Sequence, residues 1–169
     1  MSASPAESPT HPADRLLDRI DARRAPVCVG LDPVLERLPA PLRPTATSPE
    51  AVAAAFEAFS LAVIDAVAAS VPAIKPQSAC YERLGWRGVR VLETVIAAAR
   101  DRGLEVLLDV KRGDIGLTAG HYAAAARGAG ADWATASPYL GVDGLEPLLA
   151  EGLGVFSLVR TSNPGGDRL

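Results

Sequence analysis

The sequence has 169 residues, of which 49% are hydrophobic and 22% are charged, and this is enough for one domain with a real core. A net charge of −3 with scattered basic residues leaves no electrostatic footprint for nucleic acid, and no apolar run approaches the ~20 residues that cross a bilayer. Cys28 and Cys80 have neither disulfide-framework nor zinc-site spacing. We therefore expect a cytoplasmic protein with a small-molecule partner.

Residues 1–12 are rich in Ser, Pro, Ala and Thr and lack the basic and apolar segments of a signal peptide. We expect a disordered leader there and a single domain over residues 13–169. Beyond the leader, apolar residues spaced three or four apart predict helices, and short apolar runs predict strands. In chain order these are a helix at 14–23, a strand at 27–31, a helix at 51–70, a strand at 71–74, a helix at 86–102, a strand at 104–110, a helix at 116–127, a strand at 132–137, a helix at 142–151 and a strand at 155–159.

Polar residues stand at or just beyond the carboxyl ends of four of these strands, and they are Asp32, Lys75, the pair Asp109 and Lys111, and Ser162. Asp32 and Lys75 each have an ordinary interpretation, because Asp-Pro commonly starts a turn and a lone lysine is usually a solvated charge. Asp109 and Lys111 lie two apart and so point to the same face of their strand. Their spacing is compatible with a structural ion pair and with a charged site.

The alternation of strands and helices predicts an α/β protein with a parallel sheet and right-handed crossovers, either an open doubly wound sheet or a (β/α) barrel. Two features favour the barrel. Polar residues gather at the carboxyl ends of several strands, and no Gly-x-Gly-x-x-Gly follows the first strand. A (β/α)8 TIM barrel needs ~250 residues. We therefore expect the amino-terminal part of such a barrel, with about five βα units.

The segment from Asp109 to Thr118 reads Asp-Val-Lys-Arg-Gly-Asp-Ile-Gly-Leu-Thr. It resembles the signature of orotidine 5'-phosphate decarboxylases, which is Asp-x-Lys-x-x-Asp with a Thr four residues on. Four further segments resemble the longer-chain bacterial branch in the same order, and they are Val-Gly-Leu-Asp32-Pro, Ile-Lys75-Pro-Gln-Ser-Ala, Ser137-Pro-Tyr-Leu-Gly-Val-Asp and Arg-Thr-Ser162-Asn-Pro-Gly. One such motif would be weak evidence, whereas five in order are difficult to attribute to chance.

The resemblance implies decarboxylation of orotidine 5'-phosphate to uridine 5'-phosphate, the last step of de novo pyrimidine synthesis, with no metal or organic cofactor. It also implies that Lys75, Asp109 and Lys111 form an alternating charged array with Lys111 as the proton donor, and that Asp114 belongs to the catalytic set. Lysines and carboxylates held close together favour one another's charged forms and titrate as a coupled group. Losing the substrate carboxylate would relieve its repulsion by Asp109.

For the substrate and the partner, the resemblance implies that Asp32 binds the ribose and that Ser162 hydrogen-bonds the pyrimidine ring. Asp114, with Ile115 and Thr118, would be lent across a dimer interface to the site of the neighbouring subunit. The expected assembly is therefore a homodimer with shared active sites.

Two alternatives compete with this interpretation. Related barrels place an Asp-x-Lys-x-x-Asp block on the same strand in magnesium-dependent sugar-phosphate decarboxylases or epimerases. The Lys75-Pro-Gln block and Ser162 argue against that activity. The other alternative is a truncated, non-catalytic chain, because the family holds the substrate phosphate with a glycine-containing loop and an arginine on its seventh and eighth βα units. Without those contacts, turnover as well as affinity should fall.

Overall fold

The structure is a computed structural model that describes residues 11–166. A five-stranded parallel sheet forms its centre. The strands are β1 (Cys28–Leu31), β2 (Ala73–Pro76), β3 (Glu105–Arg112), β4 (Trp133–Ala136) and β5 (Gly154–Ser157). The helices are α1 (Pro12–Arg23), α2 (Pro49–Val67), α3 (Ser78–Glu82), α4 (Trp86–Asp101), α5 (Gly116–Gly128) and α6 (Glu146–Ala150), with short 3-10 turns at Leu35–Arg37, Ala40–Leu42, Pro138–Leu140 and Val142–Gly144.

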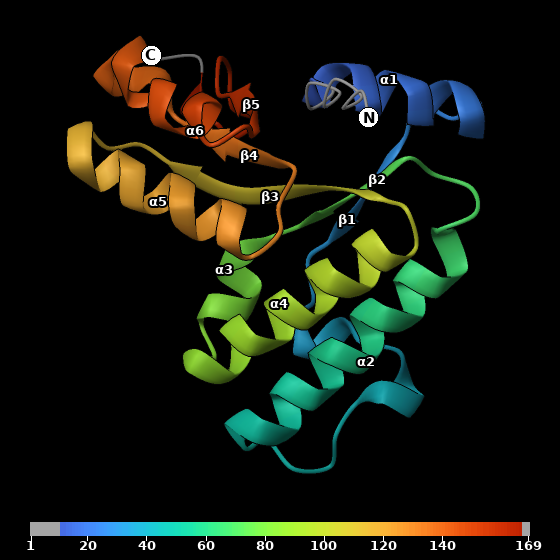
Figure 1. Ribbon diagram of the computed structural model, residues 1–169. Coiled ribbons are helices and arrows are strands. Elements are labelled where there is room, and N and C mark those ends of the chain that lie inside the picture. Colours follow the sequence, from blue (N-terminus) through green and yellow to red (C-terminus); the bar gives the residue numbers. More distant parts are fainter. Residues whose placement is uncertain (1–10, 167–169) are drawn as a thin grey trace, which may run out of the picture.

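The strands pair in sequence order, β1-β2-β3-β4-β5, and every pairing is parallel. A doubly wound sheet reverses its strand order at a switch point, whereas a βα barrel adds each strand beside the previous one. Figure 1 shows α2 and α4 on one side of the sheet and α1 on the other. The observed order is therefore that of consecutive units of a barrel wall.

Helix α2 forms where the sequence predicts it, and local signals explain its start. The Ser48 side chain caps the helix by accepting a hydrogen bond from the Ala51 amide at 3.2 Å, and a proline follows in the first turn. Its buried face includes Phe56, which meets Tyr81 edge to face with ring centroids 6.4 Å apart. This face packs against α4 and supplies much of the core between helices and sheet.

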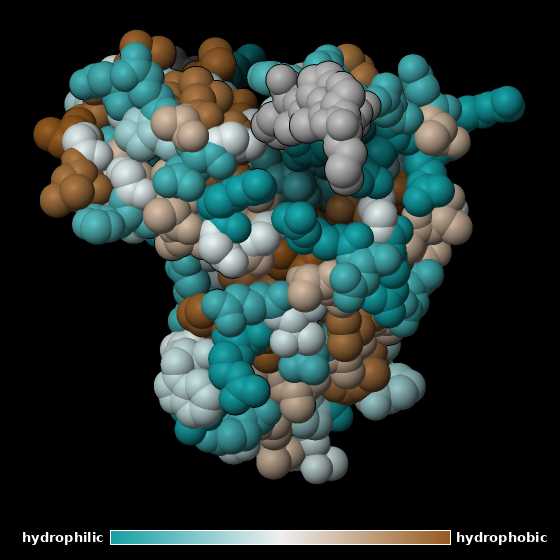
Figure 2. All heavy atoms as spheres, viewed as in Figure 1, coloured by the Kyte–Doolittle hydropathy of each residue, from teal (hydrophilic) through white to brown (hydrophobic). Residues whose placement is uncertain are grey.

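Figure 2 shows polar and charged side chains over much of this face, with apolar patches at the upper left, over α5 and α6, and on the lower right, over α2. The buried apolar residues of α2 and α4 belong to the core beneath this surface. No helix within residues 11–166 combines the length and apolar character needed to span a membrane.

Several element boundaries differ from the sequence expectation. Helix α1 begins at Pro12, and the His11 ring nitrogen accepts a hydrogen bond from the Ala13 amide, so residues 11 and 12 belong to the folded part and not to the expected leader. A proline in the first helical turn lacks only an amide that the helix would leave unbonded. The other ten leader residues lie outside the described residues. Strand β5 ends at Ser157, which leaves Ser162 five residues beyond it.

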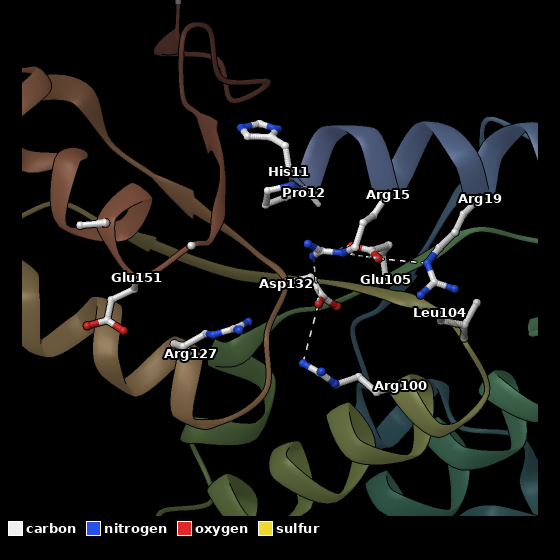
Figure 3. A pocket seen from close by; sticks show the side chains of 12 residues that line it. His11, Pro12, Arg15, Arg19, Arg100, Leu104, Glu105, Arg127, Asp132 and Glu151 are labelled. Atoms are coloured by element: carbon white, nitrogen blue, oxygen red, sulfur yellow. Dashed lines mark hydrogen bonds and ion pairs between the residues drawn. The ribbon is translucent and has the colours of Figure 1, made fainter. Parts of the chain in front are cut away.

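At the amino end of the sheet, α1 is attached by ion pairs to the first residue of β3. Glu105 is 1% exposed, and its carboxylate meets Arg19 at 3.0 Å and Arg15 at 3.4 Å. The indole nitrogen of Trp133 donates to the same carboxylate at 3.1 Å. Figure 3 shows both arginines reaching from α1 toward Glu105, with Asp132 beside them. This cluster lies at the opposite end of the strands from the predicted site.

We expect Glu105→Gln to lower the free energy of unfolding of the full-length protein by about 2 kcal/mol. The change keeps the side-chain shape but removes the carboxylate that pairs with Arg19 and with Arg15, and Arg15 keeps Asp132 at 3.4 Å. Breaking fully buried pairs costs more than this. Arg15 and Arg19 remain 31% and 37% exposed, so solvent reduces the loss. Urea denaturation measures the effect.

The matched control is Asp65→Asn, because Asp65 also pairs with an arginine, Arg102, at 2.6 Å but is 59% exposed. An exposed pair of this kind contributes less than about 1 kcal/mol. Equal, small losses in the two variants would show that the Glu105 cluster does not hold α1 in place.

Candidate active site

The charged residues predicted from the sequence meet at the carboxyl ends of β2 and β3. Lys75 is the third residue of β2, and Asp109 lies in the second half of β3. The two strands are parallel neighbours, and an isolated bridge joins Gln77 to Asp109 where the regular pairing ends. This is the end of the sheet at which βα-barrel enzymes assemble their active sites.

The Asp109 carboxylate is the centre of the site, and it is 4% exposed. One oxygen, Oδ2, accepts hydrogen bonds from Lys75 Nζ at 2.9 Å and from Gln77 Nε2 at 3.1 Å. The other, Oδ1, accepts from Lys111 Nζ at 2.5 Å and from Thr135 Oγ1 at 2.9 Å. Four donors from three strands and one strand end thus hold a single buried carboxylate, and two of them are ammonium groups.

The backbone at Lys111 is unusual. Its φ angle is +45°, in the left-handed region that residues with a side chain rarely adopt. The pairing with β4 is irregular there, because Leu108 faces Ala134 whereas Arg112 faces Ala136. The three residues between thus lie opposite Thr135 alone. Such a conformation costs about 1–3 kcal/mol and persists only where its surroundings impose it.

The hydrogen bonds also set the charge states of the site. Burial by itself would raise the pKa of Asp109, but the hydrogen bonds from Lys111, Lys75 and Thr135 outweigh burial and lower it. Burial would likewise lower the pKa of Lys75, yet the hydrogen bond and charge of Asp109, together with the charge of Asp32, raise it. The carboxylate and this ammonium group are therefore both ionised at neutral pH.

Both lysines of the chain lie in this site. Lys75 and Lys111 are the only lysines among the 169 residues, and all other basic side chains except histidine are arginine. A lysine ammonium is a compact charge that can give up its proton, whereas an arginine stays protonated. The Lys111 side chain is 48% exposed, so its ammonium can reach a molecule bound at the strand ends.

The remaining predicted residues, all within the described part of the chain, make no hydrogen bond to the Asp109 carboxylate. Asp32 directly follows β1 and is exposed, and its charge acts on Lys75. Asp114 accepts a hydrogen bond from the Ile115 amide at 2.9 Å, and Ile115 is 58% exposed. Thr118, in the first turn of α5, is exposed as well.

Within residues 11–166, no hydrogen bond or ion pair joins Asp114 to the Lys75–Asp109–Lys111 cluster. Ser162 is exposed on the segment after β5. The structure therefore brings together three of the predicted residues, with Asp32 nearby. The roles of Asp114, Ile115, Thr118 and Ser162 stay predictions.

Two residues of the site were missed by sequence reasoning, namely Gln77 and Thr135. Gln77 lies two positions beyond Lys75, so the alternation that links Asp109 with Lys111 also places it on the same face. Thr135 is the only hydroxyl residue in a strand of Trp and Ala, and this polar residue in an apolar strand was the one sequence feature that could have indicated its role. Its partners lie on β3 and depend on the register between the two strands.

Comparison with known proteins identifies the family to which the chain is similar. The family model described as "Orotidine 5'-phosphate decarboxylase / HUMPS family" matches residues 25–169. An orotidine 5'-phosphate decarboxylase of Rhodopirellula baltica is 48% identical over 156 residues, and the one of Salinispora tropica is 44% identical over 163 residues. These alignments cover 84% and 89% of this chain.

Among solved structures, the OMP decarboxylase of Leishmania donovani superposes with a TM-score of 0.77 at 36% identity, covering 95% of this chain and 58% of that one. The chain spans about half the length of the curated relatives it matches, 52% for Rhodopirellula baltica and 55% for Salinispora tropica. This likeness confirms the predicted barrel architecture over the five units present. The chain belongs to the orotidine 5'-phosphate decarboxylase / HUMPS family.

Proposed function

We propose that the protein decarboxylates orotidine 5'-phosphate to uridine 5'-phosphate. The observation that carries this proposal is the buried Asp109 carboxylate held between the ammonium groups of Lys75 and Lys111 at the strand ends. Membership of the family supports this substrate class, and the relatives in Rhodopirellula baltica and Salinispora tropica bear the name of this activity. The array supplies the charges that such a reaction needs.

In the proposed reaction the substrate carboxylate lies beside Asp109, which stays ionised because lysines pair with it. Two carboxylates at close range repel each other. Breaking the bond between C6 of the pyrimidine and this carboxylate releases neutral carbon dioxide, and the repulsion disappears. The electron pair of the broken bond remains on C6.

Lys111 completes the reaction. Its positive charge stabilises the carbanion at C6, and its ammonium then donates a proton to that carbon to give uridine 5'-phosphate. The neutral amine takes up a proton from water before the next turnover. Lys75, which binds the other oxygen of Asp109, keeps that carboxylate in place and charged throughout.

We infer that Asp32 binds the ribose hydroxyls and that Ser162 binds the pyrimidine. Asp32 stands at the end of β1, beside Lys75, where the sugar of a substrate facing Lys111 can reach it. Ser162 lies on the exposed segment that follows β5, at the same end of the sheet. Both side chains are free of the hydrogen bonds that hold the charged array together.

We further infer a homodimer in which Asp114, Ile115 and Thr118 complete the site of the partner subunit. These residues lie on the exposed loop after β3 and on the first turn of α5. Ile115 is 58% exposed and the neighbouring Leu117 is 79% exposed. Apolar side chains gathered on an exposed loop favour a protein interface.

The proposal places the protein in the cytoplasm. Cys28 and Cys80 are free thiols in the described part of the chain, and Cys28 is exposed. A reducing compartment keeps exposed thiols from oxidation. The proposed substrate and product are also small charged molecules that a cytosolic enzyme meets in solution.

The test is an assay of the purified full-length protein with orotidine 5'-phosphate, following loss of its absorbance and formation of uridine 5'-phosphate. We expect turnover that is the same with and without a chelator. A magnesium-dependent sugar-phosphate enzyme would lose its activity with the chelator and would leave orotidine 5'-phosphate intact. Absence of substrate loss with a folded, dimeric, full-length protein would contradict the proposal.

A further inference from the structure

We propose that Thr135 is a positioning residue of the charged array. Its hydroxyl holds Lys111 in the orientation from which the ammonium donates a proton to C6 of the pyrimidine. The expected effect on kcat rests on the proposed function. The geometry that supports the inference is independent of any substrate. Thr135 lies on β4, is 8% exposed, and contacts three consecutive residues of β3.

The hydrogen bonds of this hydroxyl use all of its capacity. A threonine hydroxyl has one proton to donate and two lone pairs to accept with. Thr135 Oγ1 donates to Asp109 Oδ1 at 2.9 Å and accepts from the Val110 and Lys111 amides at 3.0 and 2.9 Å. One oxygen atom therefore fixes the carboxylate of the array and the backbone that carries its proton donor.

This clamp explains how Lys111 keeps its unusual backbone. Regular pairing between β3 and β4 is interrupted from Leu108 to Arg112, so the ladder does not impose the backbone conformation between them. The hydroxyl of Thr135 takes the place of a main-chain acceptor for two amides in this interval. With φ at +45°, the Lys111 side chain turns back to Asp109 Oδ1.

The arrangement also predicts which lysine depends on Thr135. Lys75 and Gln77 come from the β2 side and bind Asp109 Oδ2, whereas Lys111 and Thr135 share Oδ1. Removing the hydroxyl should therefore disturb Lys111 more than Lys75. In kinetic terms the loss should fall on kcat, since Lys111 acts on the reacting carbon, and less on KM.

The experiment compares Thr135→Val, which keeps the branched shape but has no hydroxyl, with Thr135→Ser, which keeps the hydroxyl. The matched control is Thr94→Val, because Thr94 is an exposed threonine whose hydroxyl bonds only the Arg90 carbonyl of its own helix. All variants are made in the full-length protein. Thermal unfolding monitors folding, and kcat and KM are measured with orotidine 5'-phosphate.

A second readout uses the scarcity of lysine. Residues 1–169 of a protein labelled with ¹³C-lysine give only two side-chain Cε signals, from Lys75 and Lys111. Lys75→Arg assigns them, and any signals from residues beyond 169 stay constant among the variants. We expect Thr135→Val to shift the Lys111 signal more than the Lys75 signal. We also expect it to lower kcat about 100-fold, the size of loss that small displacements of catalytic groups cause.

Thr135→Ser should keep kcat within about threefold of the parent and leave the Lys111 signal at its parent position, because the serine hydroxyl can make the same three hydrogen bonds. A Thr135→Val protein that is merely less stable, with kcat and the Lys111 signal unchanged, overturns the inference. If Thr135→Val does not fold, Thr135→Cys replaces it, since a thiol is similar in size to the serine hydroxyl but bonds weakly. Equal kcat and equal Lys111 signals in the Ser and Cys variants would then overturn it.

The two proposals fail in different ways. If the parent protein does not turn over orotidine 5'-phosphate, the proposed function is wrong, and the Lys111 signal still decides whether Thr135 positions that lysine. If the parent is active and Thr135→Val matches it in kcat and in the Lys111 signal, only the inference on Thr135 is wrong.

Discussion

Lys111→Ala is expected to abolish decarboxylation by the full-length protein while binding of uridine 5'-phosphate stays measurable. In the proposed mechanism, the variant loses both the proton donor and the positive charge that faces the developing carbanion. General acids contribute about 10²–10⁴-fold, and a preorganised charge contributes about 10²–10³-fold more. We therefore expect kcat to fall by at least about 10⁴-fold. Lys75 and Asp32 remain, and they are part of the proposed ligand site.

Steady-state kinetics and titration calorimetry with uridine 5'-phosphate measure the two effects separately. The matched control is Arg112→Ala, which removes the cation next in the chain. The Arg112 guanidinium pairs with Glu82 at 2.9 Å and lies over the Tyr122 ring, away from Asp109. If Lys111→Ala changes neither rate nor binding, Lys111 is not the proton donor.

Mixed dimers of Asp114→Ala and Lys111→Ala chains are expected to recover activity that neither variant has as a homodimer. If each site takes Lys111 from one subunit and Asp114 from the other, a mixed dimer contains one intact site and one doubly altered site. Random mixing of equal amounts makes half of the dimers mixed, so about one quarter of the parent activity should return. Activity is measured before and after exchange of subunits between the two variants.

The control for this experiment is a mixture of Lys111→Ala with Asp109→Ala. Lys111 and Asp109 contact each other within one chain at 2.5 Å, so no subunit arrangement restores an intact pair. That mixture should stay inactive. If the Asp114 mixture is equally inactive although the subunits exchange, the active sites are not shared.

Local sequence patterns were sufficient for the alternation of strands and helices and for part of the site. The cap at Ser48 and the apolar spacing after it define α2, because helix formation depends on residues a few positions apart. The alternation of side chains along a strand predicted that Asp109 and Lys111 share a face, and the two side chains do form an ion pair. The left-handed backbone at Lys111 that accompanies this contact was not predictable from the alternation. The motif resemblance then predicted the family, which spacing by itself left open and which the family model confirms.

Some local features still escaped prediction. Helix α3 spans only Ser78–Glu82 and is too short for an apolar period to be recognised. The last strand was placed at 155–159, but it ends at Ser157, since boundaries carry weaker signals than the periodic interior of an element. Ser162 is therefore farther from the strand end than the sequence indicated.

The sequence by itself determined the order of the βα units and the presence of an aspartate and two lysines at adjoining strand ends. Tertiary structure decided how those charges are held. Thr135 and Gln77 reach Asp109 only because β4 and β2 pair with β3 in one register, and Lys111 adopts its left-handed backbone only where that pairing is interrupted. Contacts between strands depend on residues far apart in the chain, and a pattern of near neighbours does not encode their register.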